Sequence, residues 1–395
     1  MGHFAGLVTV VMPVFDGLPW LEQTLASVDA QRDMRMERIA VDDGSTDGSA
    51  DLLRRRGWTV LSTDRVGPNV ARAHGLANAE GSMVAFLDQD DIWHPEHLAL
   101  AADTLGAMPS AGAAIAPRIP FFGRHLPRLG GHRHGPATFD PWAVYPVSLV
   151  DTPSMAVVHR TALEAAGGWP ADRILGSDPL LWWRLSAPAP LAILPRRTVG
   201  VRRSARSLSS VSRDRPLDYL DHLRRAAADA LFHAPVGERE WLAESGERIL
   251  AAVSRLLTAI IDGNGMARAA VDMETALSAS SDVMVFASIG FCGWLMAPPL
   301  RLLQATGVDP VALVVDGWPA TARRTRAAAL QMVAAVAGPL RTSGLALRSP
   351  FSPRRLSVAA AAWAFAAAER GGRVADPLNL RYGLRPWMKN EEPSR

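Results

Sequence analysis

The sequence contains very little cysteine and lysine. Cys292 is the single cysteine among 395 residues, so neither an intramolecular disulfide nor a metal cage built from several thiolates can form. This usage fits a reducing cytoplasm. Lys389 is the single lysine among the 42 Lys and Arg residues, and no basic stretch is interleaved with aromatic residues. We therefore expect no nucleic-acid partner.

Long apolar segments and a secretion signal are also missing. The apolar run at 283–297 is shorter than the roughly 20 residues of a spanning helix and stops at a Pro-Pro pair. The N-terminus has no basic region or cleavage site, and its apolar run breaks at Pro13. A hydrophobic fraction of 48% with 21% charged residues predicts folded domains, two or three at this length. We expect a cytoplasmic protein, with peripheral contact to the inner membrane face as an alternative.

The first hundred residues alternate between short β-branched segments and longer segments with helical periodicity. Strands are predicted at 7–14, 37–43, 58–62 and 83–88, and helices at 18–31, 46–56 and 69–79. Such repeated β-α units predict a parallel sheet covered by helices on both faces. Ligands bind such sheets at the carboxyl ends of the strands.

Three polar clusters follow predicted strands, at 13–16, 42–47 and 88–91. The first strand runs into PVFDGLPW and not into a G-x-G-x-x-G turn, which argues against a nicotinamide dehydrogenase. In the third cluster Asp88, Asp90 and Asp91 repel one another, so they need solvent, hydrogen-bond donors or a cation. A divalent ion that also holds a diphosphate fits this corner. The alternative is a solvated loop that caps the next helix.

Four segments resemble successive motifs of the family 2 glycosyltransferases, which are inverting enzymes with the GT-A fold. They are VTVVMPVFD, VDDGSTDGS, FLDQDDIWHP and SDPLLWWRL, and the resemblance covers about residues 7–210. It implies an α/β, GT-A (Rossmann-like) catalytic domain at 1–212. The implied reaction transfers a sugar from a nucleoside-diphosphate sugar to a hydroxyl acceptor such as a natural product, glycan or cell-envelope precursor.

The resemblance also implies which residues bind the donor. The implied nucleotide-binding residues are Pro13, Val14, Phe15, Asp43, Arg72, Asp88 and Gln89. Asp90 is the implied ligand of Mn²⁺ or Mg²⁺, with Asp91 in a supporting place. For Asp42 and Asp43 the alternative is an Asx turn that caps the next helix, a role that fits Asp47 better. For Arg72 it is an ordinary solvated helix residue.

By resemblance, Asp178 is the catalytic base that removes the proton of the acceptor hydroxyl. Family members usually carry an acidic pair here, whereas this chain has Ser177 before Asp178. The alternative for Asp178 is simple capping of the following helix. The segment 196–210 corresponds to a mobile loop of the family, where Arg202, Arg203 and Arg206 are candidate clamps for the diphosphate.

Residues 213–395 are rich in Ala, Arg, Leu and Trp and predict a mainly helical region. Helical periodicity is clearest at 217–232, 247–261, 323–337 and 357–372. Core packing is the first expectation for this region, and an acceptor groove, a homo-oligomer contact or a membrane-surface contact are alternatives. For the whole chain, the alternatives to an active transferase are a catalytically silent binding or scaffold protein and, less well matched, a sugar-phosphate nucleotidyltransferase.

Overall fold

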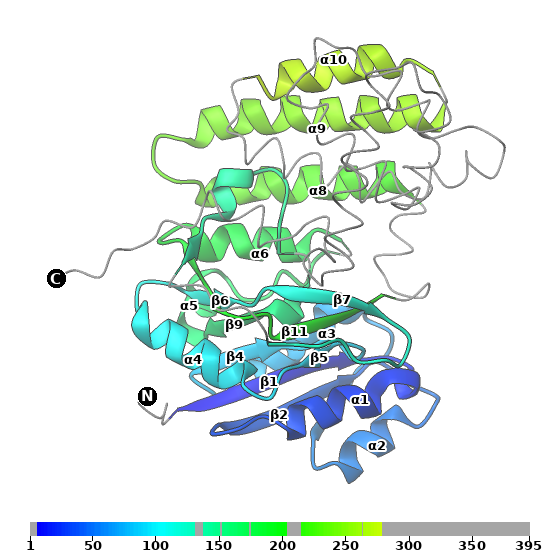
Figure 1. Ribbon diagram of the computed structural model, residues 1–395, viewed down its shortest axis with the longest axis vertical. Helices are drawn as coiled ribbons and strands as arrows, with labels where there is room; N and C mark the ends of the chain where they lie inside the picture. Colours follow the sequence, from blue (N-terminus) through cyan, green and yellow to red (C-terminus); the bar gives the residue numbers. More distant parts are fainter. Residues whose placement is uncertain are drawn as a thin grey trace.

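The computed structural model describes residues 6–130, 137–150, 152–173, 175–203, 215–262 and 264–278. In Figure 1 a β-sheet lies in the middle of the molecule, with helices α1 and α2 at one end and the stacked helices α6, α8, α9 and α10 at the other. The architecture is therefore a mixed α/β fold extended by helices, as the sequence predicts.

The main sheet has eight strands in the order β3-β2-β1-β4-β9-β6-β10-β8. Their bounds are β1 Leu7–Val14, β2 Arg35–Asp42, β3 Thr59–Ser62, β4 Met83–Phe86, β6 Ala113–Ile115, β8 Thr138–Phe139, β9 Ala156–His159 and β10 Leu191–Ile193. Strands β1 to β4 are parallel, which confirms the expected units. Strand β9 runs antiparallel to β4 and β6, so the sheet as a whole is mixed.

A second, three-stranded sheet contains β5 (Ile92–Trp93), β11 (Val199–Arg203) and β7 (Arg118–Phe122) in the order β5-β11-β7. The sequence predicts a mobile loop over 196–210, and the structure differs at residues 199–203. This segment pairs with β5 on one side and with β7 on the other, and residues 199–202 are all buried, as expected of a central strand. Residues 204–214 lie outside the described part of the chain.

Helices cover both faces of the main sheet. They are α1 Leu18–Asp29, α2 Ser49–Arg55, α3 Pro68–Ala77, α4 His97–Ala107, α5 Arg160–Ala165 and α6 Ser177–Ser186. In β1, Val10 and Met12 belong to the core cluster with α1, α2 and α4, whereas Val11 belongs to the cluster with α6. Alternate side chains of one strand thus bury against opposite helix layers, which explains its continuously apolar sequence.

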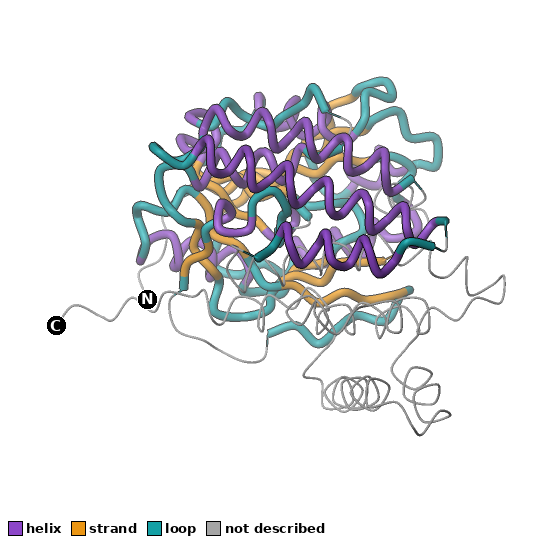
Figure 2. The backbone as a smooth tube through the Cα atoms, turned by 90° about the horizontal axis from the view of Figure 1, so that it is seen from above, coloured by secondary structure: helices purple, strands orange, loops and turns teal. Residues whose placement is uncertain are grey.

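Three further helices extend the fold beyond residue 214, namely α8 (Pro216–Ala230), α9 (Arg239–Ile261) and α10 (Met266–Ala276). They confirm the helices predicted at 217–232 and 247–261, while those predicted at 323–337 and 357–372 lie outside the described residues. Helix α9 contacts both α8 and α10, and helices run side by side in Figure 2. In the described ranges, no helix combines the length and apolar character needed to cross a membrane.

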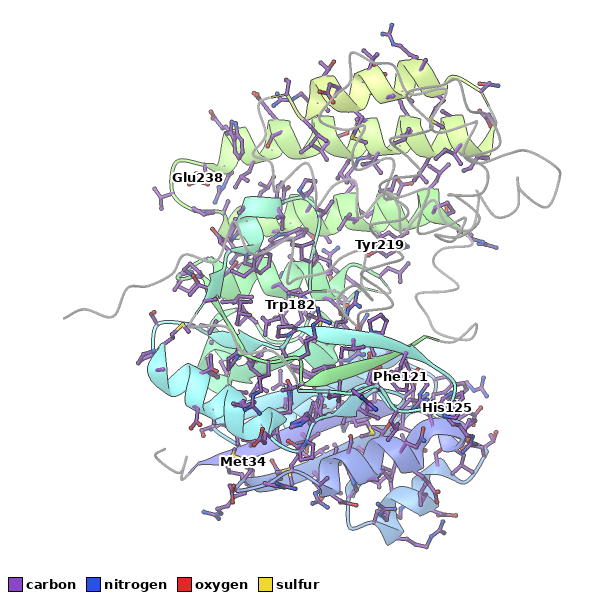
Figure 3. The ribbon with its side chains drawn as sticks, in the orientation of Figure 1. Met34, Phe121, His125, Trp182, Tyr219 and Glu238 are labelled. Atoms are coloured by element: carbon purple, nitrogen blue, oxygen red, sulfur yellow. The ribbon has the colours of Figure 1, made fainter. Side chains whose placement is uncertain are left out.

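The outer helices share a hydrophobic core with the sheet. Trp182 of α6 is fully buried between them (Figure 3) and belongs to one cluster that runs from β4 to α10. The Tyr145 hydroxyl donates to the Ala227 carbonyl of α8 at 3.0 Å. These contacts fit the core packing expected of the helical region, and the predicted division at 212/213 falls outside the described residues.

Candidate active site

The three polar clusters meet at the carboxyl ends of β1, β2 and β4. The Asp43 amide donates to the Val14 carbonyl at 2.8 Å. The Gln89 side chain accepts from the Phe15 amide at 2.8 Å and donates to the Phe15 carbonyl at 3.0 Å. These bonds bring together the strand ends that the sequence predicts to converge, because parallel strands end on one edge of the sheet.

Two exposed groups stand at the predicted nucleotide side. Pro13 and Val14 are buried at the end of β1, whereas the Phe15 ring is 40% exposed. The Arg65 guanidinium lies over that ring at 4.9 Å from its centroid, and Arg65 has a left-handed φ of 51°. Non-glycine residues rarely adopt this conformation, and those that do cluster at active sites and ligand-binding loops.

The two aspartates of the DDGS segment differ in their partners. The buried Asp43 carboxylate accepts at 2.8 Å from the Thr63 hydroxyl and from the Val66 and Gly67 amides, so it fixes the loop that carries Arg65. Asp42 Oδ1 is buried and has no partner among the described residues. The contact of Asp43 with a base edge stays a prediction.

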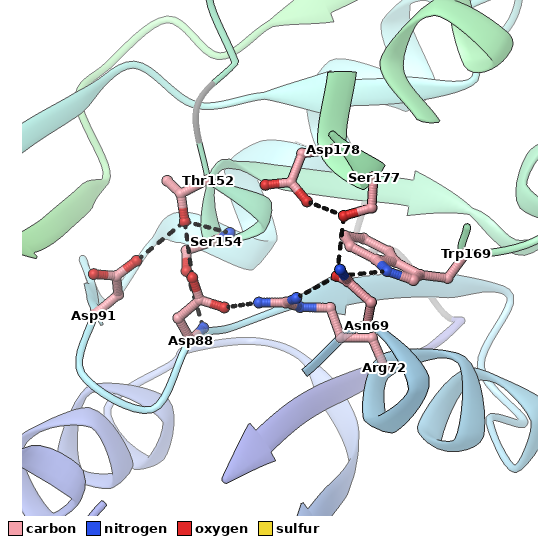
Figure 4. A network of polar contacts seen from close by, with 9 residues as sticks. All are labelled: Asn69, Arg72, Asp88, Asp91, Thr152, Ser154, Trp169, Ser177 and Asp178. Atoms are coloured by element: carbon pink, nitrogen blue, oxygen red, sulfur yellow. Dashed lines mark hydrogen bonds and ion pairs between the residues drawn. The ribbon is translucent and has the colours of Figure 1, made fainter. Parts of the chain in front are cut away.

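Asp88 forms an ion pair with Arg72 (Figure 4). Arg72 is 7% exposed and its guanidinium lies 5.0 Å from the Trp169 ring centroid. The alternative of a solvated helix residue is therefore wrong, because the helix periodicity places Arg72 against the sheet. The second Asp88 oxygen accepts from the Thr152 hydroxyl at 3.2 Å, and the Asp88 amide donates to the Ser154 hydroxyl at 3.0 Å.

Asp91 follows Asp88 and Asp90 in the turn after β4 and is 2% exposed. It accepts from the Arg202 amide at 2.9 Å. Burial first, and then the charges of Asp90 and Asp88, raise the pKa of the Asp91 carboxyl well above its ordinary value. The cluster therefore concentrates negative charge that a bound cation would offset.

The donor set is small for a metal site. In the part of the chain that the structure describes, no group of three His, Cys, Asp or Glu side chains is arranged to hold an ion. The oxygens of Asp88 and Asp91 already accept hydrogen bonds, and Asp90 is half-buried. This set fits a hard cation held by one or two carboxylates and completed by substrate phosphates and water, and it does not fit an all-protein cage.

Arg202 has a different place from the one predicted. It is 2% exposed. Its guanidinium meets protein groups, namely the carbonyls of Asp90 and Gly123, the Gln23 Oε1 atom, and the rings of Trp20 and Phe121. Arg202 therefore holds the Asp90–Asp91 turn in place. Its guanidinium is packed against protein groups, which is not the place expected of a phosphate clamp. For Arg203 and Arg206 the clamp stays a prediction, because the Arg203 side chain and residue 206 are outside the described part.

We expect Arg202→Met to destabilise the fold by at least about 2 kcal/mol, because the carbonyls of Asp90 and Gly123 lose the guanidinium that donates to them. Urea unfolding of the full chain measures this loss, with the exposed Arg55→Met as the matched control, expected within about 0.5 kcal/mol of the original chain. Unchanged stability combined with weaker binding of a nucleoside diphosphate would instead support the phosphate clamp.

Asp178 lies across the site from Asp88 (Figure 4). Helix α6 begins after Gly176, whose φ is 80°, and its N-terminus has no side-chain cap. The capping alternative for Asp178 is therefore wrong. The half-exposed Asp178 stands in the first turn of α6, and its Oδ1 atom lies 3.2 Å from the Ser177 hydroxyl. The carboxylate is thus partly accessible to solvent.

Sequence reasoning missed several polar residues of the site. Figure 4 shows four of them joining the predicted ones: Asn69, Thr152, Ser154 and Trp169. Asn69 lies in the first turn of α3, three residues before the predicted site residue Arg72. Thr152 and Ser154 flank a proline before β9. Position at a helix start or before a strand is the only local signal, and it is shared by many residues without function.

Curated relatives match part of this chain. The chain is 38% identical over 104 residues to TuaG of Bacillus subtilis (strain 168), whose name includes teichuronic acid biosynthesis glycosyltransferase, covering 25% of this chain and 41% of TuaG. It is 40% identical over 100 residues to the succinoglycan biosynthesis protein ExoW of Rhizobium meliloti (strain 1021), covering 23% and 31% respectively. The chain thus spans less than half the length of these curated relatives.

Among solved structures, S. aureus TarS (residues 1–349, in complex with UDP) is similar over 82% of this chain and 90% of that chain, with a TM-score of 0.50 and 18% identity. This likeness supports the GT-A-type fold. The family model described as "Glycosyl transferase family 2" matches residues 9–167, the part that contains β1 to β4 and the aspartate cluster. Over residues 9–167, this chain is therefore similar to glycosyl transferase family 2.

Proposed function

We propose that this chain is a metal-dependent, inverting glycosyltransferase that moves a sugar from a nucleoside-diphosphate sugar to a hydroxyl acceptor. The observation that carries the proposal is the continuous polar network from Asp88 through Arg72 to Asp178 (Figure 4). This network supports the proposal because it connects the carboxylate that would bind the donor to the carboxylate that would act as the base.

The donor side would hold the nucleotide at the strand ends. Phe15 and Arg65 offer an aromatic face and a guanidinium to a base, and the loop fixed by Asp43 borders the same edge. Arg72 would orient the Asp88 carboxylate through their ion pair. Asp90, with Asp88 beside it, would hold Mn²⁺ or Mg²⁺. A bound divalent ion would neutralise charge that develops on the leaving diphosphate.

On the acceptor side, Asp178 would act as a general base. An acceptor hydroxyl is a weak nucleophile, and a positioned carboxylate takes its proton as the new bond to the anomeric carbon forms. The bond between that carbon and the diphosphate oxygen breaks at the same time, and the electron pair leaves with the diphosphate. Attack from the face opposite the leaving group inverts the anomeric configuration.

The choice of a nucleoside-diphosphate sugar has support from a structural neighbour, since S. aureus TarS is solved with UDP and with UDP-GlcNAc. The acceptor class, here a natural product, glycan or cell-envelope precursor, remains a proposal. We also propose that the region beyond residue 213 takes part in acceptor binding, oligomer formation or membrane contact. The proposed location is the cytoplasm.

A screen of donor turnover tests the proposal. The full chain is incubated with Mn²⁺ and a panel of UDP-, GDP- and dTDP-sugars, and release of the nucleoside diphosphate is measured with and without simple hydroxyl acceptors. We expect release with at least one donor and an inverted anomeric centre in the product by NMR. Tight donor binding without any turnover would instead favour the catalytically silent binding protein.

A further inference from the structure

Asn69 is the central member of the polar network in Figure 4. It is 6% exposed in the first turn of α3. Its Oδ1 atom lies 3.1 Å from Arg72 NH1, 3.1 Å from Trp169 Nε1 and 3.0 Å from Ser177 Oγ. Its Nδ2 atom donates to the Arg173 carbonyl at 2.8 Å. One amide therefore contacts both the donor side and the acceptor side of the site.

The orientation of this amide is fixed by chemistry. The indole of Trp169 and the guanidinium of Arg72 can only donate, so the Asn69 atom that faces them is the oxygen. The amide nitrogen correspondingly faces a carbonyl, which can only accept. The Ser177 hydroxyl lies within hydrogen-bond distance of the same Oδ1 atom and of Asp178 Oδ1, and it has one proton for these two acceptors.

The contact between Ser177 and Asn69 limits the hydrogen bonds that Ser177 can make to Asp178. The Ser177 hydroxyl has one proton, and its oxygen lies 3.0 Å from Asn69 Oδ1 and 3.2 Å from Asp178 Oδ1. While the proton points to Asn69, Ser177 cannot donate to the ionised Asp178 carboxylate. It can, however, accept from a protonated Asp178. The Ser177 oxygen then stands ready to share the proton that Asp178 would take from an acceptor hydroxyl.

We propose that Asn69 is a positioning residue that holds the Ser177 proton away from Asp178 while it fixes the Arg72–Asp88 pair. This inference rests on the proposed function, because it assigns Asn69 to the base of that same reaction. Asn69 would not touch the reacting atoms, and it would act through Ser177 and Arg72.

A double-mutant cycle in the full chain tests the proposal. We expect Asn69→Ala to lower kcat on the order of 10- to 100-fold while the Kd of the donor stays nearly unchanged. Asn69→Asp keeps an acceptor oxygen of the same reach but loses the donor to the Arg173 carbonyl, so it is expected to recover kcat only in part. In a Ser177→Ala background, Asn69→Ala is expected to have a smaller effect, because the part that acts through the Ser177 proton is gone and only the part that acts through Arg72 remains.

The matched control is Asn78→Ala at the other end of α3, where the exposed Asn78 amide donates to the His74 carbonyl at 2.9 Å. It is expected to keep the original kcat. Equal losses of kcat, donor affinity and thermal stability in both Asn69 variants, or additive losses in the cycle, would overturn the role of Asn69 alone. An original chain that transfers no sugar from any donor would overturn both the proposed function and this inference.

Discussion

Asp178→Asn is expected to lower the rate of glycosyl transfer by roughly 10²- to 10⁴-fold, the range that positioned acid–base catalysis supplies. Donor affinity and thermal stability are expected to stay nearly intact. The reason is that Asp178 is half-exposed in the first turn of α6 and that an amide has almost the same size as the carboxylate, so the substitution removes the base with little change in shape. Transfer assays, donor calorimetry and thermal melts on the same preparation measure the three quantities.

The neighbouring Asp172→Asn is the matched control, since the Asp172 side chain is 77% exposed. A defect of Asp178→Asn confined to turnover would indicate a role in the transition state, whereas parallel losses of stability and donor binding would indicate a structural role. If Asp178→Asn transfers sugar at the original rate, Asp178 is not the base and Asp172 becomes the first candidate.

Asp90→Asn is expected to weaken the metal-dependent binding of a nucleoside diphosphate strongly and to abolish most turnover. The substitution removes a charged oxygen ligand from a site in which the protein supplies few of them, so the ion and the diphosphate lose a shared contact. Calorimetry with UDP and GDP, each with and without Mn²⁺, separates this effect from a general loss of nucleotide affinity.

The exposed Asp103→Asn on α4 serves as the control with the same change of charge. It is expected to bind and turn over donor like the original chain. Metal-dependent affinity that is unaffected by Asp90→Asn would mean that the aspartate cluster only terminates β4 and starts the next turn, which was the alternative from the sequence.

Much of the catalytic half of the fold could be predicted from local patterns. The strand predicted at 7–14 is β1 with the same bounds, and the helix predicted at 69–79 is α3 at Pro68–Ala77. The first is a short, almost continuously apolar segment and the second repeats its buried residues with the period of a helix, and both patterns are encoded by neighbouring residues alone. The antiparallel direction of β9 has no such signal, because a short buried strand reads the same in either direction.

The sequence by itself determined the parallel β1–β4 units and the polar strand ends. Periodicity and the alternation of strands and helices along the chain can be read locally, and parallel strands end on one edge of the sheet, where Asp43 and Asp88 therefore lie. Only the tertiary structure decided what each polar side chain meets. Arg202 and Arg72 are arginines in plausible motifs, yet the first is packed behind the Asp90–Asp91 turn and the second pairs with Asp88. Asn69 joins the two sides of the site through residues about 100 positions away in sequence. Burial and hydrogen-bond partners depend on chain segments that meet only after folding, so no local pattern could have revealed them.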